Sequence, residues 1–277
     1  MRRRCNKKRI RFLVENDLEF MMRQERSSSM DIKILGISGS PRKGRNTEFL
    51  IEKVFEGARE MGHTESLPGD IETDMISLAK LKIQPCTACV KCDKVGEEQE
   101  RYCPTIKDDL PIVIDKMLWA DAIVLGVPVY VGDVTAQMKI LMDRCEVIGS
   151  GSKRGKLKVG LRNKVGGAVV QGTLRHGGQE FTAATIHRFF IFKGMIPVGA
   201  MEGHSAAGPW GGMGVGYPYG SAISKGNVLE KDELGIKACR DLGRRLALVT
   251  KMIKPYAARE REEFIEWHSK NITKQDL

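Results

Sequence analysis

The sequence of 277 residues is short of aromatic residues and of long apolar runs. Phe, Trp and Tyr together make up 6% of it, and no uninterrupted apolar segment approaches the roughly 20 residues that a membrane-spanning helix needs. The longest such segment, residues 122–131, has the length of a buried strand and its loop. We therefore expect a soluble protein of the cytoplasm that does not bind a membrane.

The signatures of several enzyme classes are also missing. The chain has neither a Walker loop nor a G-x-G-x-x-G fingerprint, and no histidine is accompanied by a recognisable set of serine and carboxylate. Its basic amino terminus does not resemble a secretory signal, because Glu15, Asp17 and Glu19 interrupt any apolar stretch. These absences argue against structural disulfides, and they predict no catalytic acid, base or nucleophile.

What the chain does have is a dense group of cysteines. Four of its seven fall within eighteen residues. Two residues separate Cys86 from Cys89 and Cys89 from Cys92, and Cys103 follows after ten more residues. Thiolates spaced in this way can converge on one metal centre, and four of them can hold a [4Fe-4S] cluster. A four-thiolate zinc site and inert thiols are the alternatives. The gap of ten residues weakens the case for Cys103 as the fourth metal ligand, and Cys145 is the substitute for it.

Charge and composition divide the chain into three parts. Residues 1–29 hold half of the net charge of +10 and read as a flexible, basic extension, either solvated or an arm for nucleic acid or an acidic partner. We favour the solvated extension. Residues 30–254 are predicted to form one domain with the cysteine loop at 84–107, and residues 255–277 a charged helical tail.

Strand-like and helical runs alternate through the middle part. The expected strands are residues 32–38, 75–83, 122–127, 165–170 and 195–198. The expected helices are residues 46–61, 108–119, 135–148, 178–192 and 231–253. This alternation predicts an α/β fold with a doubly wound, five-stranded parallel sheet, in which ligands bind beyond the carboxyl ends of the strands.

The loop after the first strand has the composition of a phosphate site. Hydroxyls, an amide and a guanidinium precede or open the following helix, where backbone N–H groups also point outward. The side chains concerned are Ser38, Ser40, Arg42, Asn46 and Thr47. The plainer interpretation is an ordinary turn with Asn46 or Thr47 as the helix cap.

Two more loops are predicted at the same edge of the sheet. The loop after residues 122–127 combines an apolar, aromatic edge with backbone polar groups, which suits a stacked heteroaromatic ring. It reads Pro128, Val129, Tyr130, Val131, Gly132 and Asp133. The loop after residues 165–170 contains Gly177 and Gly178.

Together the loops resemble those of the NADPH-dependent FMN reductase superfamily of flavodoxin-like proteins. The resemblance rests on residues 36–47 (GISGSPRKGRNT), 128–144 (PVYVGDVTAQMKILMDR) and 175–190 (RHGGQEFTAATIHRFF). The cysteine run with its tail, residues 103–109 (CPTIKDD), narrows it to the iron-sulfur flavoproteins. The similarity covers residues 31–253.

This resemblance implies two cofactors and an electron route. FMN would bind with its phosphate on the first loop and its ring against residues 128–133 and 177–178. Cys86, Cys89, Cys92 and Cys103 would ligate one [4Fe-4S] cluster. Electrons would pass from a ferredoxin-like donor through the cluster to FMN and on to a small acceptor such as oxygen, peroxide or a quinone. The family forms homodimers or homotetramers in which a cluster approaches the FMN of a neighbouring subunit.

Two other functions compete with this one. The first is an NAD(P)H-dependent FMN or quinone reductase without a cluster, and the second, which we disfavour, is a zinc-containing module that binds nucleic acid. The basic stretch 153–164 is either a docking surface for an acidic ferredoxin or a nicotinamide phosphate, or a solvated loop. The glycine-rich stretch 202–225 is expected to form a flap near the flavin or an oligomer contact.

Overall fold

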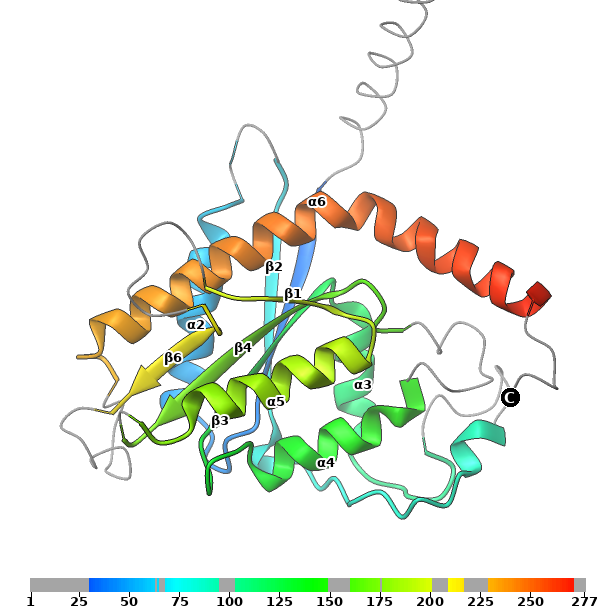
Figure 1. Cartoon of the computed structure of the whole chain (residues 1–277), viewed down its shortest axis with the longest axis horizontal. Coiled ribbons are helices and arrows are strands. Elements are labelled where there is room, and N and C mark those ends of the chain that lie inside the picture. The colour runs from blue at the N-terminus through cyan, green and yellow to red at the C-terminus, as the bar shows by residue number, and fades with distance from the viewer. Residues whose placement is uncertain are drawn as a thin grey trace, which may run out of the picture.

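The computed structural model describes residues 30–62, 64, 68–94, 103–148, 160–174, 176–200, 209–216 and 229–271. A parallel sheet lies between two layers of helices (Figure 1). The strands are β1 (Ile32–Ser38), β2 (Ile71–Ser77), β3 (Ala122–Pro128), β4 (Val165–Gly172), β5 (Ile196–Val198) and β6 (Gly212–Val215). The helices are α2 (Asn46–Arg59), α3 (Leu110–Trp119), α4 (Ala136–Arg144), α5 (Gln179–Phe192) and α6 (Glu233–Asn271), with 3-10 turns η1 (Leu78–Lys80), η2 (Lys91–Lys94) and η3 (Cys145–Ile148).

The strand order β2-β1-β3-β4-β5 is that of a flavodoxin-like, doubly wound sheet, which confirms the expected fold class. The fifth position of the sheet is shared by two short strands. β5 pairs with the first part of β4 and β6 with the second part, both in parallel. β6 was not expected, because it lies within the stretch 202–225 that we predicted as a flap.

The two faces of the sheet have separate apolar cores. α2 and α6 cover one face, and α3, α4 and α5 cover the other. β3 and β4 are buried along their whole length, as expected for central strands covered on both sides. α2 and α6 approach so closely that a Cβ atom at Gly243 would lie 2.0 Å from the carbonyl oxygen of Val54.

Three elements differ from those expected by more than two residues. The second strand spans Ile71–Ser77 instead of residues 75–83, because the first half of this edge strand contains three consecutive polar residues, Glu72 to Asp74, and gave only a weak signal. The helix expected at 135–148 ends at Arg144 and continues as η3. α6 is a single helix through Pro255 and joins the expected helix 231–253 to the charged tail, with a bend near the middle of its length (Figure 1).

Several predicted features lie outside the described residues. These are the basic extension 1–29, most of the basic stretch 153–164 and most of the stretch 202–225. In the part of the chain that the structure describes, no helix is both long enough and apolar enough to cross a membrane.

Candidate functional site

The three predicted loops meet at the carboxyl edge of the sheet. The hydroxyl of Thr135, which caps the start of α4, donates to the carbonyl of Gly39 at 2.7 Å, and the N–H of Gly39 donates to Gly126 at 2.7 Å. A Cβ atom at Gly178 would lie 3.0 Å from the Cα atom of Gly132. The loop after β1 therefore contacts the loop after β3, and the loop after β3 contacts the loop after β4.

The loop before α2 forms a cradle of buried polar side chains. Ser38, Ser40, Asn46 and Thr47 are almost wholly buried, whereas Arg42 is exposed. The Ser38 hydroxyl and the Asn46 Oδ1 atom are buried without a hydrogen-bond partner among the described residues. The residue before the helix, Arg45, makes no side-chain cap. Unpaired polar atoms beside an uncapped helix start suit a bound anion, so these residues fit the phosphate group of FMN.

The loop after β3 is a tight and strained turn. The backbones of Tyr130 and Asp133 exchange two hydrogen bonds, of 2.9 and 3.1 Å, around Val131 and Gly132. Both central residues have positive φ, 51° at Val131 and 80° at Gly132, as a type I′ turn requires. A β-branched residue in this conformation is strained by about 1–3 kcal/mol. The turn holds the Val131 side chain fully exposed to solvent, next to half-exposed Tyr130.

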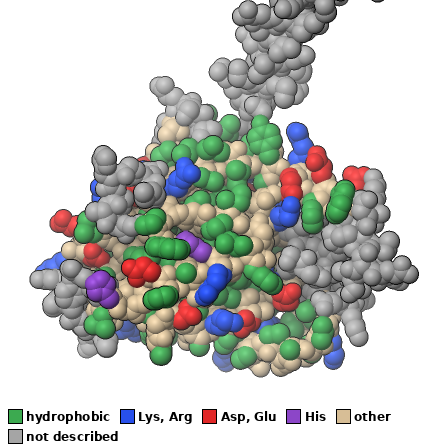
Figure 2. Space-filling model, in the orientation of Figure 1, with side chains coloured by type: hydrophobic (Ala, Val, Ile, Leu, Met, Phe, Trp, Pro, Cys, Tyr) green, Lys and Arg blue, Asp and Glu red, His purple; other side chains and the backbone are tan. Residues whose placement is uncertain are grey.

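The loop after β4 ends in Gly178, which has a positive φ of 102°. The hydroxyl of Thr182 donates to the carbonyl of Gly178 at 2.9 Å, and the N–H of Gly177 donates to the side chain of Gln179 at 2.8 Å. Beyond this loop, α5 carries several exposed apolar side chains among charged ones (Figure 2). Its exposed large side chains are Phe181, Ile191 and Phe192.

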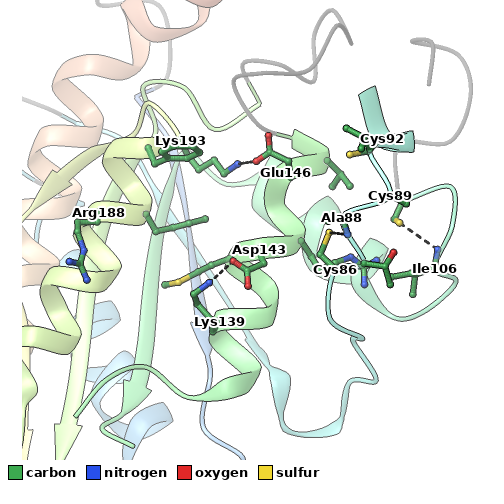
Figure 3. Close-up of a pocket in the computed structure, with 18 of the residues that line it drawn as sticks. Cys86, Ala88, Cys89, Cys92, Ile106, Lys139, Asp143, Glu146, Arg188 and Lys193 are labelled. Carbon is green, nitrogen blue, oxygen red and sulfur yellow. Dashed lines mark hydrogen bonds and ion pairs between the residues drawn. The ribbon is translucent and has the colours of Figure 1, made fainter. Parts of the chain in front are cut away.

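All four clustered cysteines line one cavity of about 770 Å³. The opposite wall consists of α4, η3 and α5, with Arg188 and Lys193 on the side away from the thiols (Figure 3). Among the described His, Cys, Asp and Glu side chains, no three are gathered closely enough to hold a metal ion as they stand. The thiols therefore face a common cavity without yet converging on one point.

The cysteine loop offers hydrogen bonds to its own sulfur atoms. The N–H groups of Ala88 and Ile106 donate to the sulfurs of Cys86 and Cys103, each at 3.4 Å. The hydroxyl of Thr105 lies 3.2 Å from Cys89 Sγ, and this contact, followed by the N–H of Lys91, lowers the pKa of that thiol. Such donors favour the thiolate, which is the form that binds metals, so these residues fit a thiolate-ligated metal centre.

The remaining described cysteines are packing residues. Cys145 is wholly buried, with its sulfur 3.9 Å from that of Met117, and burial raises its pKa to about 12. Burial also raises the pKa of Cys239. Cys145 does not line the cavity, whereas Cys103 does, so the structure does not support Cys145 as a substitute ligand.

Sequence reasoning missed the link between Arg144 and Asp108. Their ion pair, at 2.8 Å, lies beneath the cysteine loop with both side chains only 2% exposed. The basic stretch that we predicted for docking is in part structural, since Arg162 pairs with Glu260 and Lys164 donates to carbonyls at the end of α3.

The fold and the three loops define a flavodoxin-like protein, and comparison with known proteins makes this more specific. The model of the NADPH-dependent FMN reductase family matches residues 32–207. An iron-sulfur flavoprotein of Methanocaldococcus jannaschii is 40% identical over 80% of this chain and its own entire length. The iron-sulfur flavoprotein of Methanosarcina thermophila is 33% identical over 80% of this chain and 97% of its own. A protein of Geobacter metallireducens named NAD(P)H dehydrogenase (quinone) is 26% identical over 74% of this chain and 92% of its own.

Solved structures agree on the fold. RosB with a bound 8-demethyl-8-formylriboflavin-5'-phosphate intermediate aligns with a TM-score of 0.54 and 14% identity, over 87% of this chain and 89% of its own. A flavone reductase aligns with a TM-score of 0.52 and 20% identity, over 82% of this chain and 65% of its own.

The chain belongs to the NADPH-dependent FMN reductase family and, within it, to the iron-sulfur flavoproteins. The resemblance found in the sequence is confirmed, and the protein is an FMN-dependent oxidoreductase.

Proposed function

We propose that this protein passes electrons between a one-electron donor and a small acceptor by means of bound FMN and a [4Fe-4S] cluster. The observation that carries the proposal is the single cavity lined by Cys86, Cys89, Cys92 and Cys103. FMN exchanges one or two electrons and a cluster exchanges one, so the two together connect one-electron with two-electron chemistry. The proposed donor is a ferredoxin-like protein, and the proposed acceptor is oxygen, peroxide or a quinone-like compound.

The chain's own residues supply binding and orientation, not acid–base chemistry. Ser40, Arg42, Asn46 and Thr47, with the Ser38 hydroxyl beneath them, would hold the FMN phosphate. The turn from Pro128 to Asp133 and the pair Gly177 and Gly178 would flank the ring. The fixed turn geometry keeps the ring site formed before the ligand arrives, which reduces the entropic cost of binding. No described group at this edge needs to move a proton.

The two proposed cofactor sites share their supporting helices. α4 and α5 both begin at the loops proposed for FMN and then form the wall of the cysteine cavity. Lys139 is the first cavity residue of α4 and Thr185 that of α5. At 1.5 Å per residue these positions lie about 5 Å and about 9 Å along their helices. The same two helices therefore support both proposed sites.

The direct test is anaerobic purification, followed by measurement of iron, acid-labile sulfide, zinc and FMN in one preparation. We expect about four irons and four sulfides per FMN, since four thiols would bind one cubane cluster. A preparation with FMN and zinc, or with FMN and no metal, would contradict the cluster assignment.

A second candidate function is an NAD(P)H-dependent FMN or quinone reductase without a cluster. It is favoured by the Geobacter metallireducens relative, whose name is NAD(P)H dehydrogenase (quinone). Rapid bleaching of the bound flavin by NADPH in the absence of ferredoxin, in protein free of iron, would support this alternative. Bleaching that needs reduced ferredoxin and iron-loaded protein would exclude it.

We further propose that the protein works as a homodimer or homotetramer. Phe181, Ile191 and Phe192 expose an apolar face on α5, next to the loops proposed for FMN and to the cysteine cavity. Exposed large apolar residues on one helix indicate an interaction surface, and a second copy would cover them. Light scattering should show a dimer or a tetramer that Phe181→Asp weakens. A monomeric parent protein at micromolar concentration would rule the proposal out.

A further inference from the structure

Arg144, the last residue of α4, holds both ends of the cysteine loop. Its Nη1 atom donates to the carbonyl of Gln84 at 2.7 Å and to Asp108 Oδ2 at 2.8 Å, and its Nη2 atom lies 3.4 Å from Asp108 Oδ1. Gln84 lies two residues before Cys86, and Asp108 lies five residues after Cys103. One guanidinium group therefore connects the entrance of the loop with its exit.

Asp108 completes the connection from the other side. Its carboxylate accepts hydrogen bonds from the N–H of Gln84 at 2.9 Å and from that of Leu110 at 3.2 Å. Burial alone would raise the pKa of Asp108, but the hydrogen bonds from Arg144, Gln84 and Leu110 outweigh it and lower the pKa. Gln84 is thus held through both its N–H and its carbonyl, and the carboxylate is ionised at neutral pH.

A second pair of hydrogen bonds, between Lys82 and Asp109, joins the two ends of the loop outside the contacts of Gln84 and Asp108. The N–H of Lys82 donates to Asp109 Oδ2 at 2.8 Å, and the N–H of Asp109 donates to the carbonyl of Lys82 at 3.1 Å. Residues 82–84 and 108–109 therefore form a hydrogen-bonded stem beneath the cysteines. The outer hydrogen bonds join the stem to the start of α3, which Asp109 directly precedes, and Arg144 joins the stem to α4, which forms part of the wall of the cysteine cavity.

We propose that Arg144 and Asp108 are positioning residues that hold the cysteine loop at the distance from α4 at which its four thiols can bind one metal centre. This inference rests on the proposed function, in which those thiols hold a cluster. Neither residue needs to touch the metal. The planar guanidinium group of Arg144 donates to the Asp108 carboxylate and to the Gln84 carbonyl at the same time. The ammonium group of a lysine cannot reproduce this geometry.

The experiment measures cobalt(II) binding to anaerobic apoprotein by the sulfur-to-cobalt charge-transfer absorption, with FMN affinity measured on the same samples. Loss of a residue that orients metal ligands lowers metal affinity by about 10- to 100-fold. We expect this loss for Asp108→Asn and Arg144→Lys, with unchanged FMN affinity. Lys116→Met is the control, because Lys116 also makes an ion pair, with Asp74, but lies on α3 and does not line the cavity. It should bind cobalt within twofold of the parent.

A double variant separates positioning from folding. Removing one partner of a buried ion pair leaves an uncompensated charge, whereas replacing both is often tolerated. Arg144→Met combined with Asp108→Leu should therefore fold and bind FMN, yet bind cobalt at least tenfold more weakly than the parent. If the double variant binds cobalt like the parent, the positioning role is wrong. If the parent itself shows no sulfur-to-cobalt band, the thiol site of the proposed function fails, and the positioning role falls with it.

Discussion

The contact between Gly178 and Gly132 gives a direct test of the proposed ring site. In Gly178→Ala the new Cβ atom would lie 3.0 Å from the Cα atom of Gly132 and 3.1 Å from its carbonyl oxygen, so the turn after β3 must move by a few tenths of an ångström. The backbone itself is also unfavourable, because φ at Gly178 is 102°. A side chain in such a conformation costs about 1–3 kcal/mol.

Both effects should appear in separate measurements. The unfavourable backbone lowers the free energy of unfolding by about 1–3 kcal/mol, which urea titration detects. The displaced turn should weaken FMN binding about tenfold, equivalent to about 1.4 kcal/mol. The assay is quenching of FMN fluorescence on titration with flavin-free protein.

Gly194→Ala provides the matched control at the other end of α5. Gly194 also has a positive φ, 68°, but its added Cβ atom would meet nothing closer than 3.7 Å. Stability should fall by about 1–2 kcal/mol from the backbone alone, with FMN affinity within twofold of the parent. If Gly178→Ala bound FMN as tightly as Gly194→Ala, the contact between the two loops would not shape the ring site, and our reasoning would be refuted.

Three other predictions follow from individual contacts. Gly243→Ala should lower the free energy of unfolding by about 1–3 kcal/mol in urea titration, because the new Cβ atom would clash with the Val54 carbonyl. Alanine favours helices more than glycine does, so a stabilised variant would contradict this prediction. Asp108, whose pKa is lowered, contributes stability above about pH 4 and loses it as the pH falls through its folded-state pKa. The stability difference between the parent and Asp108→Asn should thus be constant from pH 5 to 8 and decrease as the pH falls below about 4. A difference that does not decrease between pH 5 and pH 3 would argue against an ionised pair. Cys103→Ser should bind cobalt much more weakly than the parent, whereas Cys145→Ser should bind it like the parent. The opposite result, with weak binding only in Cys145→Ser, would identify Cys145 as the ligand.

The central strands could be predicted from the sequence, because a strand covered on both faces is apolar along its whole length. β1 was expected at residues 32–38 and spans Ile32–Ser38, and β3 differs from its expected range by one residue. β2 was placed too late, because it is an edge strand whose first half is mostly polar, with Glu72, Thr73 and Asp74 in succession. β6 gave no signal, because two of its four residues are glycines and its pairing with β4 exists only in the tertiary structure.

The positions of the loops that we propose for the cofactors could be predicted for a similar reason, because the composition of each loop is local. Serines, glycines and cations before α2, and cysteines at two-residue spacings, can be read directly from the sequence. The pairing of Arg144 with Asp108 could not, because 36 residues separate them and only the packing of α4 against the cysteine loop brings them together. The strained turn at Val131 was also invisible, since valine is not a residue that sequence rules place at positive φ.

The hydrogen-bonded stem of residues 82–84 and 108–109 explains why a gap of ten residues between Cys92 and Cys103 is compatible with a single metal site. The entropy of closing a chain segment grows with the logarithm of its length, so each doubling of the length costs only about 0.6 kcal/mol. Each hydrogen bond that closes the stem contributes about 1 kcal/mol, and Arg144 and Asp108 fix it from beneath. The position of Cys103 is therefore set by the stem that follows it and not by the length of the segment before it. This supports our assignment of Cys103 as the fourth thiol, although its spacing alone argued against it.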